Sequence, residues 1–238
     1  MTASTERDIG NMREEKSSKP NDIMRIVVRP YGSALPLGCF AFAVGNALTS
    51  AFALHWIPST DQNVLALVLL AFVAPLELIP CIMAFLSRDT GGATAMGIFS
   101  AAWVVQGLNF ITANGGGASP TMGIFLAFLA IFLGILAFVT FSDKPLLGAL
   151  LTVAMLRSIG AALLQFGIAG AASPITAILG LLVTALALYS GLGFLLEDIK
   201  QRPLAMTFRR GEAKAALGGD LQHQLNRTTR EAGVRDQL

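Results

Sequence analysis

Six apolar segments, each long enough to cross a bilayer as a helix, dominate the chain. A membrane helix needs about 20 predominantly apolar residues to span roughly 30 Å of hydrocarbon. The segments run from about Ala34 to Trp56, Asn63 to Leu86, Gly91 to Thr112, Thr121 to Phe141, Leu146 to Ile168 and Ile175 to Leu196. We therefore predict an all-α integral membrane protein with six transmembrane helices.

The charge content excludes several other classes. Only 13% of the 238 residues are charged, against about 25% in a typical soluble domain. The net charge of +2 argues against a generic nucleic-acid binder, and we expect no nucleic-acid partner. With two cysteines, the chain is not a disulfide-rich scaffold.

Short joints with turn chemistry separate the apolar segments, as in Pro58-Ser59-Thr60-Asp61 and Ser142-Asp143-Lys144-Pro145. Such joints place successive helices antiparallel. We divide the chain into a polar tail over residues 1–30, a transmembrane domain over 31–198 and a second tail over 199–238. The first tail is predicted to be disordered and the second to be solvated and partly helical. The first tail has no apolar core of the signal-peptide type, so the first span is expected to stay in the membrane.

The placement of Lys and Arg predicts the orientation. Cytoplasmic segments of membrane proteins carry an excess of these residues. Of the 17 Lys and Arg residues, all but Arg157 lie in the two tails or in the joints that contain Arg88 and Lys144. These segments share one side of the membrane, so both termini are predicted to be cytoplasmic, in a multi-pass protein of the cell membrane (the inner or plasma membrane).

Residues suited to catalysis or metal binding are sparse. Cys39 and Cys81 fall inside predicted spans, with no other ligand type at metal-binding spacing, so a packing role is expected. His55 lies at a membrane edge and His223 in the tail. We therefore predict no metal, no cofactor, no catalytic residues and no enzymatic activity.

Polar side chains inside the spans are the sharper signal, because each costs free energy in lipid unless it is partnered or hydrated. Two are ionisable. At about 1.5 Å per residue, Glu77 and Arg157 both fall near the midplane, where they are placed to meet. The other polar residues in the spans are Asn46, Gln106, Asn109 and Gln165.

Two readings of Glu77 and Arg157 stay open. They form either a salt bridge that only clamps two helices, or a functional pair in which an arriving anion binds Arg157 and Glu77 takes up a proton. Pro75 and Pro80 flank Glu77 and predict a kink there, because each removes a backbone donor.

The start of the first span carries a recognisable motif. Ser33-Ala34-Leu35-Pro36-Leu37-Gly38, followed by Cys39-Phe40-Ala41-Phe42, resembles the Asn-Pro-Ala-Pro-Leu-Gly-Leu-x-x-Phe signature of the acetate uptake transporter family, which includes the succinate-acetate permeases. The third span, with Phe99 and Trp103 after the stretch from Arg88 to Gly97, is also similar. So is the end of the sixth span, from Tyr189 to Asp198. The resemblance covers about residues 33–210.

The resemblance implies a homo-oligomer, hexameric in the family, with a pathway for acetate and related carboxylates in each protomer. It further implies a constriction made by a first-span Phe, a third-span Tyr and a fifth-span Leu. Phe42 matches the Phe, whereas Ala102 or Trp103 falls at the Tyr. The full candidate pathway is Pro36, Leu37, Gly38, Phe42, Asn46, Ala102, Trp103, Ala154, Met155, Leu156 and Arg157.

The chain departs from the family at several positions. Ser33-Ala34 replace Asn-Pro and Leu35 replaces Ala, while Glu77 and Arg157 have no counterpart in the family pattern.

Taken with the resemblance, the sequence predicts a membrane transporter or channel for acetate and similar small carboxylates, with proton coupling. The alternatives are a pathway for another small solute such as ammonia, and a scaffold subunit that transports nothing.

Overall fold

A computed structural model describes residues 32–87, 89–112, 118–168, 172–200, 202, 204–211 and 214. Residues 1–30, which are predicted to be disordered, lie outside these ranges, and so does most of the tail after residue 211.

The described residues form helices and connecting turns. Six of the helical segments are long and apolar enough to cross a membrane, which confirms the predicted fold class. In order, the elements are α3 (Leu35–Ala53), η1 (Ser59–Asp61), α4 (Gln62–Val68), η2 (Leu69–Val73), α5 (Ala74–Leu86), α6 (Thr90–Thr112), α7 (Pro120–Thr140), α8 (Pro145–Gln165), α9 (Ala172–Lys200) and η3 (Ala205–Thr207). The second span, Ser59–Leu86, consists of η1, α4, η2 and α5 together.

Prolines mark the starts of three spans. Pro36, Pro120 and Pro145 occupy the first turns of α3, α7 and α8, where a missing N–H has no helical partner to lose. Ser119 precedes α7, and its hydroxyl accepts a hydrogen bond from the backbone N–H of Met122 at 3.4 Å. The joint residues therefore set the helix starts locally.

A π-helical turn lies in the second span shortly before Glu77. This turn, η2, ends two residues before Pro75, and Pro80 lies inside α5. Pro75 has no N–H to donate to the carbonyl four residues earlier, which favours a locally widened turn. The backbone is anchored beside it, because the Ser100 hydroxyl of α6 donates to the Ala74 carbonyl at 2.9 Å.

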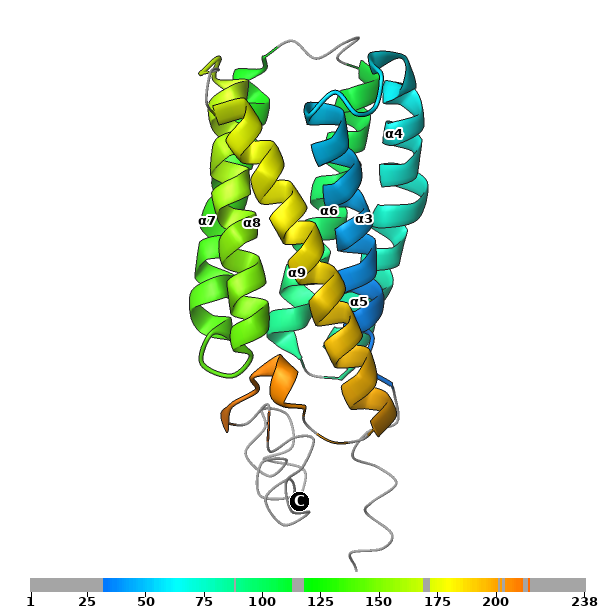
Figure 1. Cartoon of the computed structure of the whole chain (residues 1–238), viewed down its shortest axis with the longest axis vertical. Coiled ribbons are helices and arrows are strands. Elements are labelled where there is room, and N and C mark those ends of the chain that lie inside the picture. Colours follow the sequence, from blue (N-terminus) through cyan, green and yellow to red (C-terminus); the bar gives the residue numbers. More distant parts are fainter. Residues whose placement is uncertain are drawn as a thin grey trace, which may run out of the picture. The chain divides into compact units, whose positions relative to one another are not determined.

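Helix α9 packs between two groups of helices, one made of α3, α5 and α6 and the other of α7 and α8. Helix α5 packs against α3 and α6, α7 packs against α8, and α9 packs against both α8 and α3 (Figure 1). The Phe40 ring of α3 lies directly against Gly191 of α9, where an added Cβ would be 2.8 Å from Phe40 Cε1. Small residues thus allow close helix packing, as is typical within a bilayer.

The beginning of the second tail does not fit the prediction of a solvated segment. Helix α9 continues to Lys200, past the expected end at Leu196, and residues 204–211 fold against the bundle. Thr207 is completely buried there. The reason is that Glu197, inside α9, is buried and attracts donors from the following segment.

Candidate functional site

A narrow cavity lies between α3, α6, α7 and α8, with a volume of about 20 Å³. A cavity of this size holds about one water molecule. Its walls combine aromatic, aliphatic and polar side chains. They are Phe42, Asn46, Phe99, Ala102, Trp103, Gln106, Leu129, Leu133, Ala154, Arg157 and Ser158.

Three buried aromatic rings make one wall of the cavity. The Phe42 and Phe99 ring centroids are 4.2 Å apart with an interplanar angle of 33°. Trp103 meets Phe42 edge to face, with centroids 6.1 Å apart. Both separations lie in the range of attractive aromatic pairs. Such rings cannot replace the water shell of an ion, so a fully hydrated ion is disfavoured next to them.

Arg157 supplies the charged group of the lining. Its Nη2 donates to the Thr49 hydroxyl at 2.7 Å, whereas its Nε has no hydrogen-bond partner among the described residues. The nearby polar groups are committed to the backbone: the Asn46 amide donates to the Phe42 carbonyl at 2.8 Å, and the Ser158 hydroxyl donates to the Ala154 carbonyl at 2.9 Å. A guanidinium at a cavity wall, in contact with a neutral hydroxyl, is suited to binding an anion.

Glu77 lies behind the cavity wall rather than in it. The side chain is completely buried, and its Oε1 accepts a hydrogen bond from Trp103 Nε1 at 3.0 Å. Its Oε2 has no partner in the described part of the chain. Glu77 therefore contacts the cavity wall through the Trp103 indole.

The expected pairing of Glu77 with Arg157 is wrong. Within the described ranges, no ion pair joins them, and each makes a different contact. The physical reason is helix packing: α5 packs against α3 and α6, whereas α8 packs against α7 and α9. A similar depth in the membrane does not bring two side chains together when their helices are separated.

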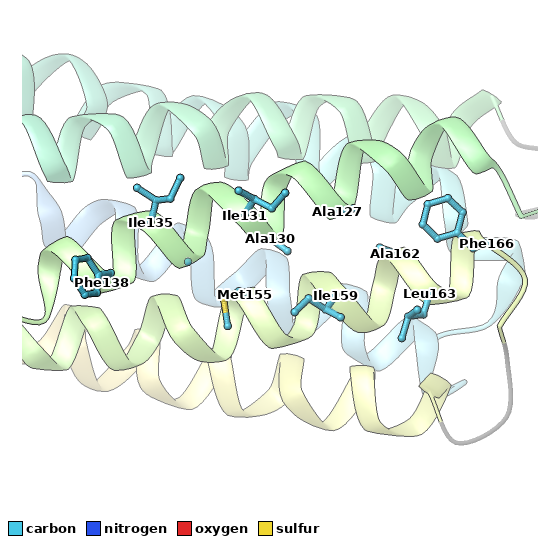
Figure 2. Close-up of a pocket in the computed structure, with 11 residues that line it drawn as sticks. Ala127, Ala130, Ile131, Ile135, Phe138, Met155, Ile159, Ala162, Leu163 and Phe166 are labelled. Atoms are coloured by element: carbon cyan, nitrogen blue, oxygen red, sulfur yellow. The ribbon is translucent and has the colours of Figure 1, made fainter.

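The other predicted pathway residues divide into groups. Phe42, Asn46, Ala102, Trp103, Ala154 and Arg157 line the cavity. Pro36, Leu37 and Gly38 lie away from it at the start of α3, where Leu37 is exposed. Leu156 is 44% exposed. Met155 lines a separate apolar groove between α7 and α8 (Figure 2).

Sequence reasoning missed part of the lining. Phe99 was not assigned to the constriction, although it stands one helical turn before Trp103 and therefore on the same face of α6. Leu129 and Leu133 have the same spacing on α7, but a pair of leucines in a membrane helix is not distinctive. Ser158 adjoins Arg157 and has no sequence signal of its own.

The described residues include no group of three or more His, Cys, Asp and Glu side chains placed to hold a metal ion. Cys39 and Cys81 are buried and unbonded to each other. The site is therefore defined by aromatic, aliphatic and cationic side chains.

These features define a multi-pass α-helical membrane protein with a narrow aromatic cavity within the bundle. Its fold is similar to that of a solved structure, the bacterial acetate channel SatP, with a TM-score of 0.63 and 17% sequence identity. The match covers 73% of this chain and 97% of that one. No family model and no curated protein sequence matches the chain. At this identity the likeness establishes the fold, and it is to a channel rather than to an enzyme.

Proposed function

We propose that this protein is a membrane channel or transporter for small monocarboxylates such as acetate. The observation that carries the proposal is the constriction formed by Phe42, Phe99 and Trp103 with Arg157 in the same cavity lining. The similarity of the fold to the acetate channel SatP supports it, as does the motif that resembles the acetate uptake transporter family.

The chemistry of the lining favours small solutes with one carboxyl group. Arg157 attracts the carboxylate, while the aromatic and leucine walls disfavour any group that must keep its water shell. A dicarboxylate places a second charge against those walls. We therefore expect acetate to pass more readily than succinate.

Proton coupling is a separate part of the proposal. A carboxylic acid that crosses an apolar constriction in its neutral form carries its own proton. Because Glu77 lies behind Trp103, the arrangement favours a proton carried by the solute over a relay through Glu77. An inward proton gradient is then expected to drive acetate accumulation.

The predicted assembly belongs to the proposal as well. Family resemblance favours a homo-oligomer, and specifically a hexamer, in the cell membrane with both termini in the cytoplasm. Native mass spectrometry in detergent measures the oligomer number, and labelling of cysteines introduced in the tails of a cysteine-free variant locates the termini.

Uptake of labelled acetate into proteoliposomes, with and without an inward proton gradient, tests the transport function. Phe42→Ala is expected to change acetate flux by about tenfold, since it removes one of the three rings that form the aromatic wall. Phe138→Ala is the matched control, because Phe138 is 83% exposed and lies on a face expected to contact lipid. Equal equilibration with and without the gradient identifies a passive channel.

Absence of acetate flux from verified folded protein would contradict the carboxylate assignment. The same vesicles then test ammonia, the alternative small solute. If neither solute passes, the scaffold interpretation is favoured.

A further inference from the structure

The Trp103 indole has two close contacts. Glu77 Oε1 of α5 accepts the hydrogen bond from Trp103 Nε1 at 3.0 Å. Gly45 of α3 lies against the ring: an added Cβ would be 2.8 Å from Trp103 Cζ2 and 2.9 Å from Cη2. Position 45 therefore has no room for a side chain while the ring keeps this place.

The ring contributes directly to the width of the cavity. Trp103 is buried and lines the cavity, and it meets the Phe42 ring in a T-shaped arrangement. A rotation of the indole away from Phe42 would widen the constriction. The ring position therefore affects the width of the cavity.

The burial of Glu77 costs free energy. It is completely buried, and its Oε2 has no hydrogen-bond partner among the described residues, so the chain tolerates a free-energy penalty there. It makes no ion pair with Arg157, and it is not among the residues that line the cavity. Its hydrogen bond within the described residues comes from the Trp103 indole.

We propose that Glu77 is a positioning residue that holds the Trp103 ring against Phe42, and that Glu77 and Gly45 together set the size of monocarboxylate that the constriction admits. This inference rests on the proposed function. It assigns Glu77 neither to a helix clamp with Arg157 nor to a proton relay, but to the geometry of the aromatic wall.

The test compares Glu77→Gln with Glu77→Leu, which have similar volumes. The Gln side-chain carbonyl still accepts the indole hydrogen bond, whereas Leu does not. All variants carry Trp56→Phe, because the chain has two Trp residues and Trp103 then becomes the only fluorophore of that type. The measurements are Trp103 emission, its anisotropy, and the ratio of butanoate to acetate flux in proteoliposomes.

We expect Glu77→Gln to keep the parent's emission, anisotropy and flux ratio. Glu77→Leu is expected to shift the emission, lower the anisotropy and raise the butanoate-to-acetate ratio by about tenfold or more, because one methylene in an apolar pocket accounts for a discrimination of about 10–200-fold. Trp103→Phe removes the indole N–H that donates to Glu77. This variant is expected to raise the butanoate-to-acetate ratio similarly. The Glu77→Leu effect should then be absent in a Trp103→Phe background.

Two results overturn the inference. One is a Glu77→Leu variant with the parent's emission, anisotropy and flux ratio. The other is a Glu77→Gln variant that loses gradient-driven uptake while its emission is unchanged, because this result assigns Glu77 to proton transfer. If Glu77→Leu does not fold, an unchanged flux ratio in Trp103→Phe overturns the inference instead.

The same experiment separates this inference from the proposed function. If the parent protein carries neither acetate nor butanoate, the monocarboxylate function fails and the size-selection role fails with it. The emission and anisotropy of the Glu77 variants then still decide whether Glu77 positions the Trp103 ring.

Discussion

Glu77 and Glu197 are both buried acids, with exposed fractions of 0% and 1%, yet their surroundings differ. Glu197 Oε1 accepts from the Leu204 backbone N–H at 3.0 Å and from the Thr207 hydroxyl, and its Oε2 accepts from Arg209 Nε at 2.6 Å. Glu77 has one donor and an unpartnered oxygen. A buried carboxyl with all its partners stabilises a structure, whereas an incompletely partnered one lowers stability and points to a functional role.

The surroundings of Glu197 extend the contrast. The Arg209 guanidinium also lies 5.1 Å from the Phe194 ring centroid, the Tyr189 hydroxyl donates to the Met206 carbonyl at 3.2 Å, and the Arg210 N–H donates to the Asp143 carbonyl at 2.9 Å. These contacts attach residues 204–211 to α9 and to the α7–α8 joint. The predicted cytoplasmic end therefore has the dense polar network that the cavity region lacks.

The largest stability effect is expected at Glu197. Glu197→Leu leaves Arg209 and Thr207 without their partner, and loss of one member of a buried ion pair costs about 3–5 kcal/mol. Thermal unfolding in detergent measures this change. Glu77→Leu is the matched variant, since Glu77 is equally buried but accepts a single hydrogen bond. A loss at Glu77 as large as that at Glu197 would contradict the contrast between the two acids.

Arg157→Leu is expected to reduce acetate flux strongly while the protein still folds. Charge-assisted hydrogen bonds contribute about 1.5–3 kcal/mol, which corresponds to a loss of about tenfold to hundredfold in flux. Thr49→Val is the control, because it removes the neutral partner of Arg157 and leaves the charge. Arg157→Leu with normal acetate flux would remove Arg157 from the pathway.

Gly45→Ala is expected to destabilise the protein by about 1–3 kcal/mol, as overpacking does in a tight core. The added methyl group would contact the Trp103 ring, so Trp103 emission should shift as well. Gly91→Ala is the control, because the nearest atom to its added Cβ is Asp89 Oδ1 at 4.0 Å. An unchanged melting temperature and emission for Gly45→Ala would show that the ring has more room than its contacts indicate.

The smallest expected effect concerns pH and the Asp89–Lys144 ion pair, whose Nζ–Oδ2 distance is 2.5 Å. Burial opposes ionisation of Asp89, but Lys144, the Gly92 backbone N–H and Arg209 together hold the pKa of the carboxyl below its usual value. A lowered pKa means stability that is present above the unfolded-state pKa of about 3.9 and is lost as the pH falls through the folded-state pKa. Because both side chains are partly exposed, the contribution is about 1 kcal/mol or less.

Asp89→Asn tests this effect in unfolding experiments between neutral pH and pH 3. The substitution is expected to lower stability near neutral pH and to flatten the decline in acid. A decline in acid as steep as that of the parent would assign the acid sensitivity to other carboxyl groups.

Features that depend on interactions between residues close in sequence were predicted accurately, whereas contacts between distant residues were not. The fourth span was predicted from Thr121 to Phe141 and runs from Pro120 to Thr140, because proline, a serine cap and apolar length act within the segment itself. The partners of Glu77 were not predicted. They depend on the rotation of α5 and α6 about their axes, which contacts between helices determine.

The sequence by itself determined the six spans, their approximate ends and the residue types available for a pathway, since hydropathy and turn chemistry are local. The tertiary structure decided which of those residues meet: Phe99 with Phe42, Glu77 with Trp103, Arg157 with Thr49, and Glu197 with residues 204–209. The physical reason is that nearly all of these contacts join residues on different elements. Many pairings are equally compatible with the local sequence, and the packing and rotation of the helices determine which pairing forms.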